Sequence, residues 1–457
     1  MSTPSAEPTV IEIEEIPYPS APRAWWTVTA MFAASVASVL DRGILTLVVD
    51  PVRHDLGISD VQISLLLGLA FGLFYAVVGI PLGLFADRIS RRKLLIIGIA
   101  IWSAATFCGG LSASFGQLFT SRLLVGLGEA ALAPCAVSLI GDMFPPNKRG
   151  RPISIYLLGQ SFAGGLSVMM TGAILSGVPA GKFAWISLLD GLAPWRVAFL
   201  IAGVSGLPVI AMLLTFREPL RRGARINRDG ASFGAMVRYM RDGWRVFVPF
   251  YGAFAMLVVL AYSVAAWGAT YLMRQFAMTP ALVGAWQGRV GMILGTIGAL
   301  LAGVIVDRLS RRAKPATKLL YLALVALLMV PASMMVFMPT ALTALLAAGF
   351  ASLLLPMIGT GMVTTVQEIV PSDMRGFGVS LFGLFNTITG QTLGPLFVAM
   401  AASHMPGVAG KPLGLALTAV CLPSVLIAVV LYLLAWLGYG ALIRRGGAFA
   451  AVVLARA

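Results

Sequence analysis

Charged side chains are scarce in this sequence. Asp, Glu, Lys and Arg make up 11% of the 457 residues, whereas apolar residues make up 59%. Soluble domains contain about 25% charged residues, so this composition excludes an ordinary soluble fold. A membrane-spanning helix needs about 20 predominantly apolar residues, and most of the chain divides into segments of that kind. The sequence therefore predicts an all-α integral membrane protein.

Side chains that carry enzyme and metal chemistry are equally scarce. The two histidines, His54 and His404, have no partner motif, and the three cysteines lie in apolar runs without the spacing of metal ligands. No G-x-x-x-x-G-K-[ST] loop, which would bind ATP phosphates, occurs in the sequence. We therefore expect no enzyme, no metal, no cofactor and no ATP-driven pump.

The apolar runs predict twelve membrane-spanning helices, six on each side of an Arg-rich stretch. We expect a disordered tail over 1–23, a six-helix bundle over 24–216, a cytoplasmic linker over 217–244, a second six-helix bundle over 245–437 and a cytoplasmic tail over 438–457. Within the linker, "SFGAMVRYM" fits either a short amphipathic helix on the inner leaflet or a solvated segment. The predicted spans are 24–50, 61–86, 94–113, 116–141, 152–176, 195–216, 245–273, 280–306, 316–338, 340–366, 376–402 and 411–437.

Basic residues are concentrated on one side of the predicted membrane. The loops 87–93, 142–151, 217–245, 307–318 and 367–375, with the two tails, contain 25 of the 33 Lys and Arg residues. The opposite loops contain four: Arg53, Lys182, Arg274 and Lys411. Because short cytoplasmic loops are enriched in Lys and Arg, we expect both termini in the cytoplasm. The same bias explains the net charge of +15, so no nucleic-acid partner is expected.

Two charged motifs occur once in each half. "GLFADRISRRK" at 83–93 and "GVIVDRLSRRAK" at 303–314 share the pattern G-x-x-x-D-R-x-S-R-R. "DMFPPNKRG" at 142–150 and "EIVPSDMRG" at 368–376 form a second pair at a similar separation. Two repeats in the same order indicate two six-helix units of the same orientation. Repeated bundles around a central site are typical of secondary transporters.

The carboxylate of the first motif suggests a gate. Asp87 follows the second span at its cytoplasmic end, where it could accept hydrogen bonds from an Arg or a helix N-terminus when the bundles close. The alternative is a basic cluster that only marks topology. The predicted gate residues are Gly83, Asp87, Arg88, Arg91, Arg92, Asp307, Arg308, Arg149 and Arg375.

Five charged side chains fall at membrane depth: Asp41, Arg42, Arg122, Glu129 and Arg289. A charge at the bilayer centre costs at least about 2.5–3.5 kcal/mol, so each requires a partner or a function. With a helical rise of about 1.5 Å per residue, Asp41 and Arg42 lie between Arg122 and Glu129 in depth. We expect Asp41 to pair with Arg122, or Arg42 with Glu129. The cluster is either a static ion pair or a proton-coupling site of Asp41, Arg122 and Glu129, in which protonated Asp41 releases Arg122.

Polar residues are fewer in the second half, and one of them follows the repeat. Asn386 follows Gln160 at the same interval that separates the second pair of motifs, so the two occupy equivalent positions. A cavity charged in one half and apolar or aromatic in the other would suit an amphiphilic substrate. The predicted substrate-binding residues are Arg42, Glu129, Gln160, Tyr262, Trp267, Arg289 and Asn386.

These motifs carry a family resemblance. The G-x-x-x-D-R-x-x-R-R loop, its second copy and "RLLVGLGEA" in the fourth span resemble the major facilitator superfamily, over all twelve helices. "VLDRGILTLVVDPVRHDLGISD" and "VGLGEAALAPCAVSLIGDMFPPNKRG" resemble spinster-like transporters. That resemblance implies lysolipid or sphingoid phosphate substrates, with Asp41 as the proton-coupling acid and with Arg42 and Glu129 lining the cavity. The loop "DPVRHDLGISD" also fits bacterial relatives that carry organic anions or drugs.

The sequence therefore predicts a proton-coupled secondary active transporter that works by alternating access on a small-molecule or lipid-like substrate. A multidrug or organic-anion carrier of the same fold is the alternative. A channel would require repeated polar rings along a constriction, whereas the sequence has one charged cluster, and a membrane-embedded enzyme lacks a catalytic motif. We expect a multi-pass monomer in the bacterial cytoplasmic membrane, in contact with its lipids.

Overall fold

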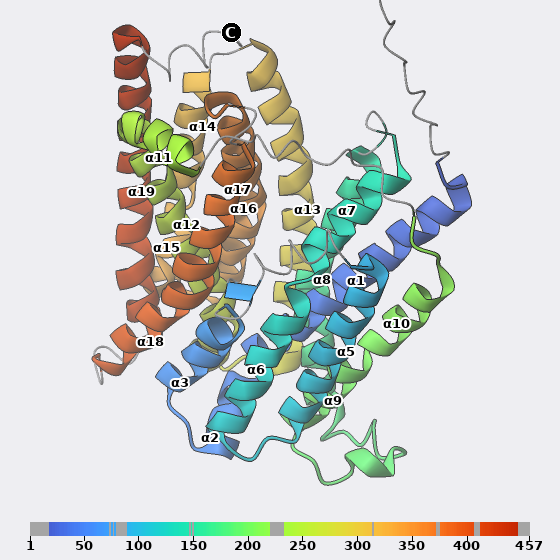
Figure 1. Cartoon of the computed structure of the whole chain (residues 1–457). Helices are drawn as coiled ribbons and strands as arrows, with labels where there is room; N and C mark the ends of the chain where they lie inside the picture. Colours follow the sequence, from blue (N-terminus) through green and yellow to red (C-terminus); the bar gives the residue numbers. More distant parts are fainter. Residues whose placement is uncertain are drawn as a thin grey trace, which may run out of the picture.

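The described part of the chain is helical and forms two bundles (Figure 1). The computed structural model describes residues 18–72, 75, 77–78, 89–145, 148, 150–219, 233–312, 315–371, 375–405 and 412–446, and no strand occurs among them. The helices before and after the linker form two groups in Figure 1, blue to green and yellow-green to red.

The first bundle contains the helices up to Thr215. Several begin where a serine side chain accepts from a free backbone N–H of the first turn: Ser59 caps α3, Ser90 caps α5 and Ser114 caps α6. The elements are α1 (Ala21–Leu47), α2 (Val49–Leu56), α3 (Asp60–Ser64), the π-helical segment η1 (Leu65–Leu69), α5 (Arg91–Gly110), α6 (Phe115–Glu129), α7 (Leu132–Met143), α8 (Gly150–Gly177), the 3-10 turn η3 (Ser187–Leu189), α9 (Pro194–Val204) and α10 (Gly206–Thr215).

The linker helix and the second bundle complete the chain. Helix α11 (Phe233–Asp242) lies where a short amphipathic helix was one of two expectations, and its Tyr239 hydroxyl donates to the carbonyl of Ile369, 2.7 Å away. The second bundle contains α12 (Trp244–Phe276), α13 (Pro280–Arg312), α14 (Pro315–Leu328), α15 (Val330–Ser333), the 3-10 turn η4 (Met335–Phe337), α16 (Ala341–Ile369), α17 (Arg375–Phe385), the π-helical segment η5 (Asn386–Leu393), α18 (Gly394–Ser403) and α19 (Pro412–Arg445).

Nine helices of the described part are long and apolar enough to cross a membrane. They coincide with nine of the twelve predicted spans. Of the other three predicted spans, 61–86 includes residues 73–74, 76 and 79–86, which fall outside the described residues. The predicted span 316–338 is divided into α14, α15 and η4. The predicted span 376–402 is divided into α17, η5 and α18. An all-helical membrane fold is thus confirmed.

Two predicted boundaries differ from the structure. Helix α1 begins at Ala21, inside the expected disordered tail, because Pro22 fits the first turn of a helix. Helix α19 continues through Gly438 and Gly440 to Arg445, beyond the expected end at 437. Gly446 adopts φ +73°, a conformation that ends helices.

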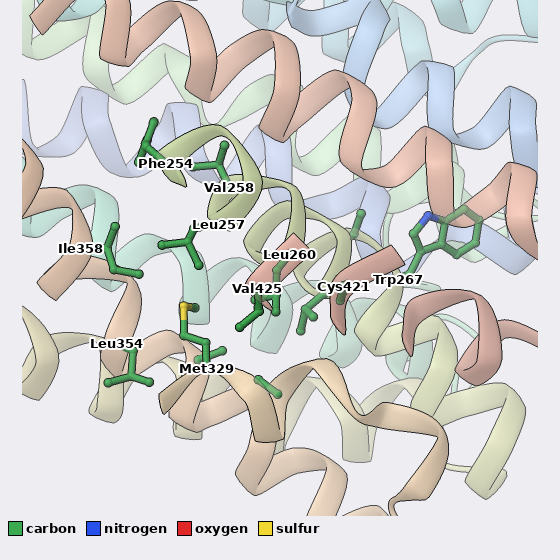
Figure 2. Close-up of a cluster of buried hydrophobic side chains, with 14 of the residues drawn as sticks. Phe254, Leu257, Val258, Leu260, Trp267, Met329, Leu354, Ile358, Cys421 and Val425 are labelled. Atoms are coloured by element: carbon green, nitrogen blue, oxygen red, sulfur yellow. The ribbon is translucent and has the colours of Figure 1, made fainter. Parts of the chain in front are cut away.

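The core of the second bundle is a layer of large apolar side chains between three helices. Figure 2 shows Leu257 and Leu260 of α12 beside Ile358 of α16 and Val425 of α19, and all four are buried. In a membrane such side chains hold helices together by van der Waals packing, because lipid is as apolar as they are.

The two bundles meet along two seams where glycines let backbones touch. In the first seam a Cβ on Gly165 of α8 would lie 2.4 Å from the carbonyl oxygen of Gly288 on α13. In the second, a Cβ on Gly68 of η1 would lie 2.2 Å from the carbonyl oxygen of Gln391 on η5. Both π-helical segments therefore lie at the second seam. Such segments are frequent at functional sites.

Candidate functional site

Asp41 and Arg122 form a buried ion pair between α1 and α6. Arg122 Nη1 lies 3.2 Å from Asp41 Oδ1, and both side chains are 2% exposed. The hydroxyl of Thr106 on α5 donates to the other carboxylate oxygen, Oδ2. Asp41 is thus held by one charged and one neutral donor.

Arg42 and Glu129 form a second ion pair beside the first. Arg42 Nε lies 3.1 Å from Glu129 Oε2, and the Ser38 hydroxyl donates to the same oxygen at 2.6 Å. The Arg42 side chain is 30% exposed, whereas that of Glu129 is 1% exposed. The guanidinium also lies over the ring of Phe71, 5.1 Å from its centroid. The partly exposed side chain of Arg42 therefore connects the buried carboxylate of Glu129 with the solvent-accessible space beside it.

The two pairs act as one electrostatic unit. Asp41 and Arg42 are neighbours on α1, and Arg122 and Glu129 lie two turns apart on α6. Both pairings considered from the sequence are therefore present at once. Two acids and two arginines give the unit no net charge when all four are ionised. Protonating either acid would leave one positive charge in excess.

Three buried atoms of this unit have no hydrogen-bond partner among the described residues: Arg42 Nε, Arg122 Nε and Glu129 Oε1. A buried polar atom without a partner costs about 1–3 kcal/mol. The unit is therefore not saturated, and it has capacity for a proton or a ligand group.

A cavity of about 570 Å³ lies between the two bundles and next to this unit. Arg42, Arg122 and Gln160 line it from the first bundle, and Tyr262 lines it from the second. Because Gln160 is exposed, the cavity is open to its surroundings. Most of the remaining lining is apolar or glycine, including Val39, Leu67, Phe71, Val168, Val264, Val290, Met329, Leu345 and Leu355.

Four predicted binding residues do not line the cavity, and the first of them is Glu129, which is buried and reaches it only through its ion pair with Arg42. Trp267 is fully buried, and its indole N–H donates to the carbonyl of Pro395 at 3.0 Å. Asn386 donates to the Tyr262 hydroxyl at 2.9 Å and does not itself line the cavity. Arg289 is exposed and does not line the cavity either. Three of the four contact a lining residue instead: Glu129 contacts Arg42, Trp267 contacts Pro395 and Asn386 contacts Tyr262.

Ser38, Thr106 and Gln287 belong to the site but were not expected from the sequence. Gln287 lines the cavity from α13, and its buried Oε1 has no hydrogen-bond partner in the part of the chain that the structure describes. Ser38 precedes Arg42 by four residues, so helical spacing could have indicated that they share a face. Thr106 and Gln287 give no such signal, because single polar residues in apolar helices are common.

An ion cluster joins the bundles at the end of the molecule where α2 and α3 lie. Arg274, at the end of α12, donates to Asp50 of α2 at 2.6 Å and to Asp60 of α3 at 2.9 Å. Arg53 lies 3.6 Å from Asp60. Burial raises the pKa of Asp60, but the hydrogen bonds and charge of Arg274, with the charge of Arg53, outweigh it and hold that pKa below its usual value.

A second cross-bundle contact lies just inside this cluster. Ser64, at the end of α3, donates to the carbonyl of Pro395 at 3.1 Å, the same oxygen that Trp267 uses. Together with Arg274, Asp50 and Asp60, these contacts close the α2–α3 end of the molecule. Figure 1 shows the ribbons of the two bundles approaching each other toward this end.

The motif arginines that are described bind within their own bundle. Buried Arg91 pairs with Asp142 at the end of α7 and lies 3.1 Å from Glu218, while Arg92 donates to the carbonyls of Leu213 and Leu214. Gly83, Asp87, Arg88 and Arg149, and the side chain of Arg375, lie outside the described residues, and Asp307 and Arg308 are exposed.

The ion pair at the second repeated motif also occurs in both bundles. Glu368, the counterpart of Asp142, pairs with buried Lys318 in the second bundle. In the first bundle, burial raises the pKa of Glu218, but hydrogen bonds from Ser90 and Arg91 outweigh it and hold that pKa below its usual value.

The described residues contain no group of His, Cys, Asp and Glu side chains placed to hold a metal ion.

Comparison with known proteins shows which family profile matches this chain. The profile described as Major Facilitator Superfamily matches residues 31–395. An MFS-type efflux pump of Mycolicibacterium smegmatis is 26% identical over 90% of this chain and 92% of its own length. A probable L-galactonate transporter of Escherichia coli K12 is 26% identical over 75% of this chain and 76% of its own length.

A solved structure is similar over nearly the whole chain. It is the crystal structure of a bacterial homologue of the human lysosomal transporter Spinster, in an inward-facing and unoccupied conformation. It superimposes with a TM-score of 0.76 at 25% identity, over 96% of this chain and 99% of that one. The expected resemblance to spinster-like transporters is thus confirmed.

Proposed function

From the premise that the chain belongs to the Major Facilitator Superfamily, whose members are multi-pass membrane transporters of small molecules and not enzymes, we propose that it carries an anionic, amphiphilic organic substrate in a proton-coupled cycle of alternating access. The observation that carries this proposal is the cavity between the bundles, with Arg42 and Arg122 on one wall and apolar side chains over most of the rest.

The cavity's chemistry supports an amphiphile. Two guanidinium groups suit a phosphate or carboxylate, because Arg binds such groups with paired hydrogen bonds. Aliphatic side chains such as Val264, Met329 and Leu345 suit an apolar tail. A volume of about 570 Å³ falls within the range of pockets for drug-sized ligands, about 300–1,000 Å³.

Coupling follows from the charge balance of the two ion pairs. When Asp41 is protonated it no longer attracts Arg122, so the guanidinium becomes available to an anion in the cavity. The proton and the anion then bind together, because each offsets the charge of the other. Removing the proton restores the Asp41–Arg122 pair at 3.2 Å and releases the anion.

The arrangement of the molecule in the membrane completes the proposal. We assign twelve spans, place both termini in the cytoplasm because of the basic loops, and expect a monomer in a bacterial cytoplasmic membrane. The α2–α3 end, closed by Arg274, Asp50 and Asp60, is then the outer end. The conformation is therefore inward-open, and the outer cluster must break before the outward-open state forms.

A ligand screen tests the substrate class. Purified protein is heated with lysophosphatidylglycerol, L-galactonate or a lipophilic cation, at mildly acidic and at mildly alkaline pH. We expect lysophosphatidylglycerol to stabilise most and to stabilise more at acidic pH. The Arg122→Gln variant should lose this effect, whereas Arg53→Gln, which removes an arginine outside the cavity, should keep it.

The other outcomes of the screen are informative. Stabilisation by L-galactonate alone would favour a small organic anion; three glutamines of the lining, Gln160, Gln287 and Gln391, could bind its hydroxyl groups. Stabilisation by the cation alone would contradict an anionic substrate and favour a multidrug carrier.

A further inference from the structure

Arg289 lies on the face of α13 that points away from the cavity. Its exposed neighbours at helical spacing are large apolar residues: Leu282, Trp286, Ile293, Ile297, Leu300 and Val304. The cavity is lined from other positions of the same helix, namely Gln287, Val290, Gly291 and Gly295. In a membrane this exposed apolar stripe faces lipid, so Arg289 is a charge on a lipid-facing surface.

The position along α13 places Arg289 near one membrane interface. The charged residues Asp307 and Arg308 mark the other interface. A hydrocarbon core needs about 20 helical residues, and counting back that length from Val306 reaches the turn of Trp286. Trp is enriched at membrane interfaces. Arg289 therefore lies about one turn inside the hydrocarbon, at about 4.5 Å from Trp286 along the axis.

The direction of the side chain brings its charge back to that interface. In an α-helix the Cα–Cβ bond tilts toward the N-terminus, which in α13 is the end at Pro280. A long Arg side chain can therefore carry its guanidinium past Trp286 to the headgroup level. No ion pair or hydrogen bond to Arg289 is found among the described residues, so none of them neutralises its charge there.

We propose that Arg289 and Trp286 form a binding site for the phosphate of an anionic phospholipid in the leaflet at the N-terminal end of α13. A guanidinium binds phosphate through two parallel hydrogen bonds, and the exposed stripe of Ile293, Ile297 and Leu300 offers a surface for an acyl chain. The preceding residue, Gly288, contacts Gly165 of the first bundle. The bound lipid thus lies beside the seam between the bundles.

Thermal stability in nanodiscs of defined lipid tests this site. The parent protein, Arg289→Leu and Lys182→Gln are each measured in phosphatidylcholine with and without phosphatidylglycerol. Lys182→Gln is the matched control, because it removes an exposed cation from a loop at the same end of the molecule. We expect phosphatidylglycerol to raise the melting temperature of the parent and of Lys182→Gln, and Arg289→Leu to lose that rise.

Two further measurements keep the result specific. In native mass spectra, Arg289→Leu should retain phosphatidylglycerol about tenfold more weakly, the effect of losing a charge-assisted hydrogen bond, and Arg289→Lys should retain it better than Arg289→Leu. In phosphatidylcholine alone, Arg289→Leu should melt no lower than the parent, which shows that the variant folds. The proposal is overturned if Arg289→Leu keeps the full response to phosphatidylglycerol, or if inorganic phosphate alone reproduces it.

Discussion

Replacing Arg274 by Gln should open the α2–α3 end of the molecule, which we propose is its outer end. Arg274 donates to Asp50 and Asp60 across the bundle interface, at 2.6 and 2.9 Å, and all three side chains are 21–28% exposed. A hydrogen bond to a charged group contributes about 1.5–3 kcal/mol, and partly exposed ion pairs fall toward the lower values. We take about 2 kcal/mol for the cluster, which corresponds to roughly a thirtyfold change in the ratio of outer-closed to outer-open molecules.

Spin-label distances at the outer end measure this ratio. Labels at Leu111 of the first bundle and Phe337 of the second lie at exposed positions near this end, in a background that lacks the exposed Cys108. The Arg274→Gln variant should populate longer distances than the parent. Arg53→Gln is the matched control, because Arg53 contacts Asp60 within its own bundle at 3.6 Å. Equal distance distributions for Arg274→Gln and the parent would refute the latch, as would an equal effect of Arg53→Gln.

Three further predictions concern single side chains. Gly288→Leu should shift the same labels toward the open state, because a Cβ there would lie 2.6 Å from the backbone oxygen of Gly165; an unchanged distribution would mean that the seam does not hold the bundles together. Glu218→Gln should cost about 1–2 kcal/mol of unfolding free energy at neutral pH. That cost should shrink as the pH falls through the lowered pKa of Glu218, because its hydrogen bonds stabilise the fold only while it is ionised; a cost independent of pH would contradict this role. Gln287→Leu should leave the ligand-free protein at least as stable, because it removes an unpartnered buried oxygen, yet weaken stabilisation by the bound substrate; a destabilised ligand-free protein would contradict the assignment.

Much of the fold could be predicted because a membrane imposes simple rules. A span must be long and apolar, and a charge within it must find a partner. Those rules predict the spans and the depth of the four charges around Asp41. Depth along two helices of known direction, with a rise of about 1.5 Å per residue, predicted that Asp41 pairs with Arg122 or Arg42 with Glu129. The structure contains both pairs.

The rotation of each helix could not be predicted from the sequence. In a soluble protein the polar face of a helix identifies its exposed side, but in a membrane both the lipid-facing and the core-facing sides are apolar. Arg289 and Trp267 were therefore assigned to the cavity, although Arg289 faces outward and Trp267 binds Pro395. The Arg274 cluster was missed for another reason: its partners, Asp50 and Asp60, lie in the other half of the sequence.

The coupling role of Asp41 is tested most directly by proton flux in proteoliposomes. A pH-sensitive dye inside the vesicles reports acidification when lysophosphatidylglycerol is added outside. The account predicts that the parent and Asp190→Asn, which neutralises an exposed loop acid, acidify the lumen, and that Asp41→Asn binds the ligand without moving protons. Acidification by Asp41→Asn at the parent rate would contradict proton coupling through Asp41.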